Sequence, residues 1–129
     1  MIDMSMGPVH ISSGPGSNSS SMCLTMVLNA LEEDNKVIWM TRNLPDQRKI
    51  LDVLGHLDDS VLNRMIAVEF GDEISRKIDG INSILSKFKK NDLLIIENWC
   101  GSHGRAKLKE RTLMEKLVSK DNAIKIIIT

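Results

Sequence analysis

The chain has 129 residues, which is enough for one domain with one hydrophobic core. Its 17 basic and 17 acidic side chains cancel, and this excludes the net positive field that drives non-specific binding to nucleic acid or anionic membranes. Only 3% of the residues are aromatic, so few side chains are available for single-stranded bases to stack on.

The two cysteines and the N-terminal sequence indicate in which cellular compartment the protein is expected. Cys23 and Cys100 are far apart and match neither a paired metal motif nor a disulfide framework, so we expect reduced thiols. No run of 18 apolar residues occurs, and the beginning MIDMSMGPVH lacks the basic region and apolar stretch of a signal peptide. We therefore expect a cytoplasmic protein without a membrane span.

Short apolar runs of strand length recur along the chain. They cover residues 9–12, 37–41, 65–70, 93–97 and 124–129. Most are too continuous for a half-exposed strand, so they predict buried parallel strands.

The segments between these runs have helical spacing. They cover residues 20–33, 45–57, 72–89 and about 105–120. The third is the clearest, because its apolar residues fall three or four positions apart and form one stripe. Strands that alternate with helices predict a single α/β domain over residues 1–129, a three-layer, doubly wound and mostly parallel sheet with helices on both faces.

A glycine- and serine-rich stretch, SSGPGSNSSS at residues 12–21, follows the first predicted strand. This is the place of a phosphate-binding loop of pattern G-x-x-x-x-G-K-[ST], in which backbone N–H groups and the lysine hold phosphate and the final hydroxyl holds magnesium. Gly14 matches the first glycine and Ser21 the final hydroxyl. Ser19 replaces the second glycine, however, and Ser20 replaces the lysine.

The missing lysine weakens the expected site. Losing its charge-assisted bond costs nucleotide binding about 1.5–3 kcal/mol. The predicted phosphate contacts are Gly14, Gly16, Ser17, Asn18, Ser19, Ser20 and Ser21. The alternative is a flexible turn whose serines cap the next helix.

Four segments together resemble the core of RecA/RadA-type recombinases, especially their RadB-like and KaiC-like relatives. They are GPVHISSGPGSNSSSMCLTMVL, NKVIWMTRNLPDQRKILDVL, RMIAVEFGDEISRKIDGINSILSKF and NDLLIIENW. The resemblance implies a RecA-like sheet of about five strands in the order 3-2-4-5-1, with ATP and magnesium as ligands. It also implies a link to DNA recombination and repair.

The residues that carry chemistry in the family are altered here. The family's magnesium-ordering aspartate corresponds to Glu97, which with Ser21 is the candidate magnesium site; the alternative is a solvated acid at a strand end. Arg42 or Asn43 stands in place of the catalytic glutamate, and Asp46 has the position of a helix-start residue. We therefore expect a pseudo-ATPase that acts by binding, or else a weak Mg-ATP-binding ATPase that uses Ser21 and Glu97.

A basic run, a Cys/His pair and the edge at the first strand are further candidate sites. Arg105, Lys107 and Lys109 form a candidate nucleic-acid patch or a solvated helix face, and Cys100 with His103 is a weak metal candidate. Family cores continue beyond the strand at 124–129, so the first strand is expected at an open edge. We expect that edge to be met by residues 1–6, by a second copy in a homo-oligomer, or by a partner protein.

Overall fold

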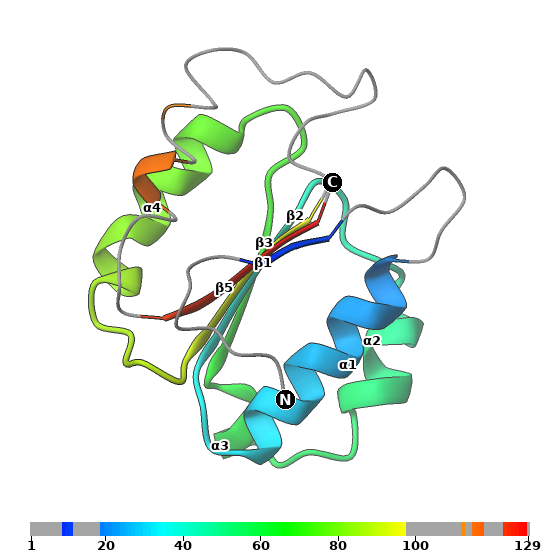
Figure 1. Ribbon diagram of the computed structural model, residues 1–129. Helices are drawn as coiled ribbons and strands as arrows, with labels where there is room; N and C mark the ends of the chain where they lie inside the picture. Colours follow the sequence, from blue (N-terminus) through cyan, green and yellow to red (C-terminus); the bar gives the residue numbers. More distant parts are fainter. Residues whose placement is uncertain (1–8, 12–18, 98–111, 113–114, 118–122, 129) are drawn as a thin grey trace.

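The computed structural model describes residues 9–11, 19–97, 112, 115–117 and 123–128. Five parallel strands form one sheet, with the order β1-β5-β4-β2-β3 (Figure 1). Read from the β3 edge, this order is 3-2-4-5-1. The strands are β1 (Val9–Ile11), β2 (Val37–Thr41), β3 (Met65–Glu69), β4 (Leu93–Glu97) and β5 (Ile124–Ile128).

Helices lie on both faces of the sheet, which confirms the predicted α/β architecture. The helices α1 (Ser19–Glu32), α2 (Gln47–Leu54) and α3 (Asp59–Leu62) cover one face. The helix α4 (Ile74–Leu85) covers the other (Figure 1). Of the predicted helix at 105–120, Thr112 and residues 115–117 are described, and they are helical.

The core has two halves because successive side chains of a strand point to opposite faces. Trp39 of β2 and Ile95 of β4 face α1, where they join the cluster that includes Leu24 and Val27. Met40 and Ile96 face α4 and join the cluster that includes its apolar stripe, Ile74, Ile78, Ile81 and Leu85. The stripe predicted from the spacing is therefore buried against the sheet.

The prediction that residues 65–70 form a fully buried strand is wrong in one respect. Ala67 and Glu69 are exposed, and the side chains of Met65, Ile66 and Val68 are only partly covered. The reason is the position of β3 at the end of the sheet, where it has only β2 beside it among the described strands. The first strand, β1, lies at the opposite end, next to β5, and residues 1–6 lie outside the described part of the chain.

The boundaries around α2 also differ from the prediction. The helix expected at 45–57 is shorter, Gln47–Leu54, and a further short helix, α3, follows it. The carboxylate of Asp46 accepts a hydrogen bond from the backbone N–H of Arg48 at 3.1 Å. Asp46 is therefore the N-cap of α2, and this contact accounts for an acid at that position without a catalytic role.

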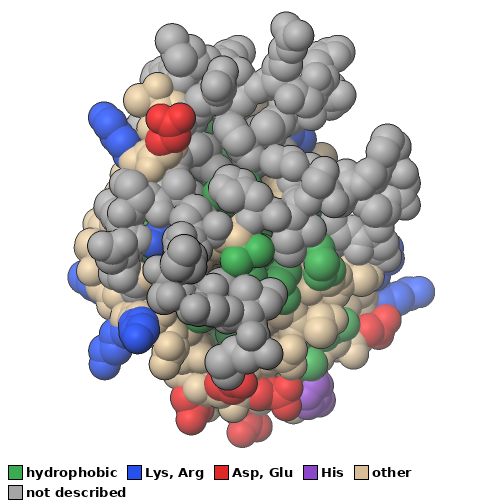
Figure 2. Space-filling model, viewed as in Figure 1, with side chains coloured by type: hydrophobic (Ala, Val, Ile, Leu, Met, Phe, Trp, Pro, Cys, Tyr) green, Lys and Arg blue, Asp and Glu red, His purple; other side chains and the backbone are tan. Residues whose placement is uncertain are grey.

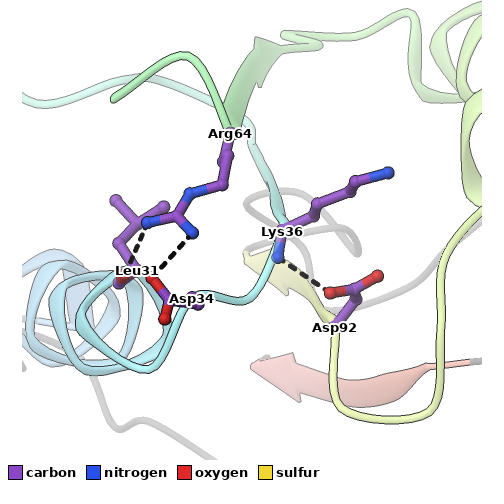
Figure 3. Close-up of polar contacts among 5 residues, drawn as sticks. All are labelled: Leu31, Asp34, Lys36, Arg64 and Asp92. Carbon is purple, nitrogen blue, oxygen red and sulfur yellow. Dashed lines mark hydrogen bonds and ion pairs between the residues drawn. The ribbon is translucent and has the colours of Figure 1, made fainter. Parts of the chain in front are cut away.

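The side chains of Arg64 and Asp92 fasten the amino-terminal edge of the sheet (Figure 3). The guanidinium of Arg64 bonds to the carbonyl oxygen of Leu31 at 2.9 Å and to Asp34 Oδ1 at 3.1 Å, which ties the start of β3 to the end of α1. The carboxylate of Asp92 accepts bonds from the backbone N–H groups of Lys36 at 2.8 Å and Lys89 at 2.7 Å. Asp92 therefore holds the starts of β2 and β4 together.

The charged side chains are not spread evenly over the surface. Figure 2 shows acidic side chains gathered at the end of the molecule where α1 ends and α3 begins. The exposed acids of these segments are Glu32, Glu33, Asp34, Asp58 and Asp59. They lie at the amino-terminal edge of the sheet, opposite the edge at which β4 ends in Glu97. In the described residues no helix is long and apolar enough to cross a membrane.

Candidate functional site

Three polar residues share one row at the carboxyl-terminal edge of the sheet. Thr41, the last residue of β2, lies in register with Glu97 at the end of β4 and with Glu69 at the end of β3. Residues in register on parallel strands point to the same face, and Ile128, which is in register with Glu97, packs on the α1 face. The row therefore faces α1, at the edge where α/β proteins bind their ligands.

Glu97 is a buried carboxylate at the start of α1. Its side chain is 0% exposed, and its Oε2 accepts a hydrogen bond from the hydroxyl of Ser20 at 3.3 Å. Ser20 lies in the first turn of α1, whose dipole favours negative charge at that end. The alternative of a solvated strand-end acid is therefore wrong. This carboxylate is buried under the helix and stabilised by its amino end.

Cys23 adds a thiol to the same place, one helical turn beyond Ser20. The thiol is buried, and this burial raises its pKa far above the ordinary value. The negative charge of Glu97 and a hydrogen bond between the two side chains raise the pKa further, while the indole of Trp39 opposes the shift. Cys23 therefore stays a protonated thiol at neutral pH and can donate its hydrogen to Glu97.

Arg42 and Asn43, which the sequence resemblance aligned with a catalytic glutamate, take part in hydrogen bonds of the loops after β2 and β3. Arg42 donates to the carbonyl oxygen of Gly71 and to Asp72 Oδ1 at 2.8 Å, and its guanidinium lies 5.4 Å from the centre of the Phe70 ring. Asn43 is exposed, and its carbonyl oxygen accepts a bond from the Thr41 hydroxyl. Arg42 therefore fastens the turn after β2 to the turn after β3.

The structure brings together some of the predicted site residues and leaves others apart. Ser20 and Glu97 are in contact, whereas Ser21 is exposed and its carbonyl oxygen accepts a bond from the Thr25 hydroxyl. Ser19 begins α1. The other candidates lie outside the described residues: Gly14, Gly16, Ser17, Asn18, Cys100, His103, Arg105, Lys107 and Lys109.

Sequence reasoning missed two members of this site. Cys23 was expected only to be a reduced thiol and Trp39 was not singled out, yet both are buried, and both Glu97 and Trp39 act on the Cys23 thiol. One signal was available for Cys23, because it follows Ser20 by three positions and so lies on the same face of a helix. Trp39 gave no such signal, since its neighbourhood depends on the pairing of β2 with β4.

Charged groups of both signs lie at the described part of this edge. The carboxylates of Glu69 and Glu97 end β3 and β4, and the ion pair of Arg42 with Asp72 joins the turns that follow β2 and β3. Among the described residues there is no group of three His, Cys, Asp or Glu side chains that could hold a metal ion. Carboxylate oxygens are the ligands that a hard cation such as magnesium prefers, and Glu97 is the carboxylate here that the sequence resemblance assigns to that role.

Neither a family model nor a curated protein matches the chain. Function is therefore inferred from the parallel sheet and from the residues at its carboxyl-terminal edge.

Proposed function

We propose that this chain is a RecA-like domain of the P-loop ATPase type that has kept the fold and lost the catalytic set. It acts by binding, either as a regulatory protein within a larger assembly or as a homo-oligomer. A role in DNA recombination or repair is the context that the family resemblance favours.

The order of the elements supports the RecA-like assignment. The glycine- and serine-rich stretch lies between β1 and α1, and Glu97 ends β4, which is separated from β1 by β5 alone. The two places that hold phosphate and magnesium in P-loop proteins thus fall at the same edge of the sheet, at the start of α1.

The observation that carries the loss of catalysis is the hydrogen bond between Ser20 and Glu97. At the position of the lysine, a neutral hydroxyl reaches the buried carboxylate. A phosphate group that entered here would meet the charge of Glu97 with no lysine to offset it. At 4 Å, one pair of like unit charges repels by about 1 kcal/mol in bulk water and about 4 kcal/mol near a protein surface.

The water-positioning group is absent as well. Phosphoryl transfer needs a side chain that orients the attacking water, and the expected place holds Arg42, whose guanidinium bonds to Gly71 and Asp72. A cation that is fastened in this way cannot accept a proton from water. The lysine and the water-positioning carboxylate are thus both replaced, by Ser20 and Arg42, whose hydrogen bonds join parts of the fold.

A weak Mg-ATP-binding ATPase is the second candidate. The position of the Glu97 carboxylate at the start of α1 favours it, because magnesium bound there would neutralise the charge that repels phosphate. In that case Ser21 and Glu97 hold magnesium, while the serine-rich turn and the helix N-terminus hold phosphate. Glu97 would have to exchange its bonds to Ser20 and Cys23 for the metal ion.

Thermal unfolding with and without Mg-ATP separates the two candidates. A ligand that binds the native state raises the melting temperature, since it stabilises that state by RT ln(1 + [L]/Kd). The binding-protein proposal predicts no shift for the natural chain at millimolar Mg-ATP, and a positive shift for Ser20→Lys, in which the lysine is restored. Ser83→Lys, on an exposed position of α4, is the matched control for added charge. A clear shift of the natural chain would favour the weak ATPase instead.

A further inference from the structure

The edge strand β3 is suited to pairing with a second copy of this chain, independently of any nucleotide binding. β3 has β2 on one side and no described strand on the other. Its central residue, Ala67, is exposed in the single chain. The strand contains no proline and no lysine, two residues that often block pairing at sheet edges, and its one charged residue, Glu69, is at its end.

Two hydrogen bonds fix which backbone groups of β3 point outward. The N–H of Val37 bonds to the carbonyl oxygen of Arg64, and the N–H of Phe70 bonds to the carbonyl oxygen of Thr41. In a parallel ladder the bonding residues recur every second position, so the even-numbered residues of β3 bond to β2. The N–H and C=O groups of Met65, Ala67 and Glu69 therefore point away from the sheet, where they need partners.

These outward-pointing groups are placed symmetrically about Ala67, so the same strand of a second copy can pair with them. We propose that two chains pair their β3 strands antiparallel about a two-fold axis through Ala67, which joins two sheets into one. Ala67 then lies opposite Ala67 of the second copy, and Met65 lies opposite Glu69. Every outward-pointing group of the strand finds a partner, giving about six inter-strand hydrogen bonds.

The side chains fit the same register. On the α4 face, Ile66 lies opposite Val68 of the second copy, a β-branched pair of the kind that stabilises neighbouring strands, and both side chains are partly exposed in the single chain. On the other face, Ala67 at the axis lets the backbones approach without a clash. No like charges meet, because Glu69 lies opposite Met65.

The short edge limits the affinity. Five residues a side bury less than a standard protein interface, so the dimer forms and dissociates with concentration. The competing occupant is a strand from another protein, which would use the same backbone groups without the two-fold symmetry.

Charge variants at Ala67 test the proposal. Light scattering on the natural chain, from low micromolar to near-millimolar concentration, should show a monomer–dimer equilibrium. Ala67→Glu and Ala67→Lys should each be monomeric, because equal charges would face each other across the axis at a Cα separation of about 5.5 Å. An equimolar mixture of the two should recover the dimer. Ala67→Thr, which keeps a neutral side chain, is the control and should dimerise like the natural chain.

Two results would overturn the proposed dimer. A natural chain that stays monomeric throughout would overturn the proposal. So would variants that are monomeric alone and remain so when mixed, since this places Ala67 away from a two-fold axis and indicates a heterologous contact. Circular dichroism of each variant checks that its fold is intact. If either charged variant is unfolded, disulfide formation between two chains is compared for Ala67→Cys and Glu69→Cys. The proposed dimer predicts a disulfide-linked dimer for Ala67→Cys alone, because only at position 67 do the two introduced thiols face each other.

Discussion

The hydroxyl of Ser20 donates a hydrogen bond to the carboxylate of Glu97, 77 positions away in the sequence. This bond joins the first turn of α1 to the end of β4, and Cys23 adds a thiol on the same side of the helix. The buried carboxylate of Glu97 therefore links the helix α1 to the strand β4. Under the proposed resemblance, the same bond joins the two positions that correspond to the lysine and the magnesium-ordering acid of a P-loop ATPase.

The first prediction concerns the stability that this bond contributes. Ser20→Ala should lower the free energy of unfolding by about 1 kcal/mol, because the buried Glu97 loses one of its donors. Urea denaturation measures the change. Ser83→Ala, at an exposed position of α4, is the control and should cost nothing. In a Glu97→Gln background the cost of Ser20→Ala should shrink, since a bond to a neutral amide is weaker than one to a carboxylate. An equal cost in both backgrounds would show that the bond adds no stability.

The second prediction is a loss of stability at alkaline pH that depends on Cys23. The pKa of this thiol is raised in the folded state, so above about pH 9, its ordinary value, the unfolded chain releases a proton that the folded chain retains. The contribution is fully present below pH 9, and from there stability should fall by about 1.4 kcal/mol per pH unit on account of this group.

The comparison that isolates this effect is between the natural chain and Cys23→Ala, measured by urea denaturation from pH 8 to pH 10. Cys100 is present in both proteins, so its titration cancels. The difference in unfolding free energy between the two should narrow as the pH rises above 9. A constant difference would mean that the thiol ionises equally in the folded and unfolded chains.

The third prediction concerns Asp92, which accepts two backbone hydrogen bonds. Asp92→Ala should lower the free energy of unfolding by about 2–4 kcal/mol, because two N–H groups lose a charged acceptor in a largely buried place. Asp92→Asn should cost less, since its amide oxygen can keep one of the bonds. Asp79→Ala, on the exposed face of α4, is the matched control. Chemical denaturation of the three variants should rank them in that order, and an Asp92→Ala as stable as Asp79→Ala would contradict the assignment.

The fourth prediction uses the left-handed backbone at the end of α1. Asp34 has φ of 64°, a conformation that glycine adopts without a steric cost. Asp34→Gly should therefore raise the free energy of unfolding by about 0.5 kcal/mol. The ion pair with Arg64 that it removes is exposed on the Asp34 side and contributes little, while Arg64 keeps its bond to Leu31. Thermal unfolding should show a higher melting temperature for Asp34→Gly and a lower one for Asp34→Ala.

The sequence predicted the sheet well because its signals are local. The strands β2 and β4 have the predicted bounds, since each apolar run is bordered by polar residues. The helix predicted at 72–89 is shorter, Ile74–Leu85, because Phe88 continues the apolar spacing although it lies beyond the helix end. A four-residue helix such as α3 is too short to produce a period.

The site was harder to predict because its contacts are not local. Ser20 and Glu97 were both singled out, but only the packing of α1 on β4 shows that they touch. The same packing buries Cys23 beside them; its spacing from Ser20 placed it on the same helix face but did not reveal its contact with Glu97. The exposure of Ala67 depends on the place of β3 in the strand order, and hydropathy along the chain does not carry that information.

The most direct test of the proposed function is the release of phosphate from Mg-ATP by the purified protein, measured beside an identical preparation of Glu97→Gln. The proposal predicts the same background rate for both, because a domain without the lysine and the water-positioning carboxylate cannot stabilise the transferring phosphoryl group. Restoring the lysine with Ser20→Lys should leave that rate unchanged. Turnover near 1 per second in the natural chain that disappears in Glu97→Gln would contradict the proposal and identify Glu97 as part of an active site.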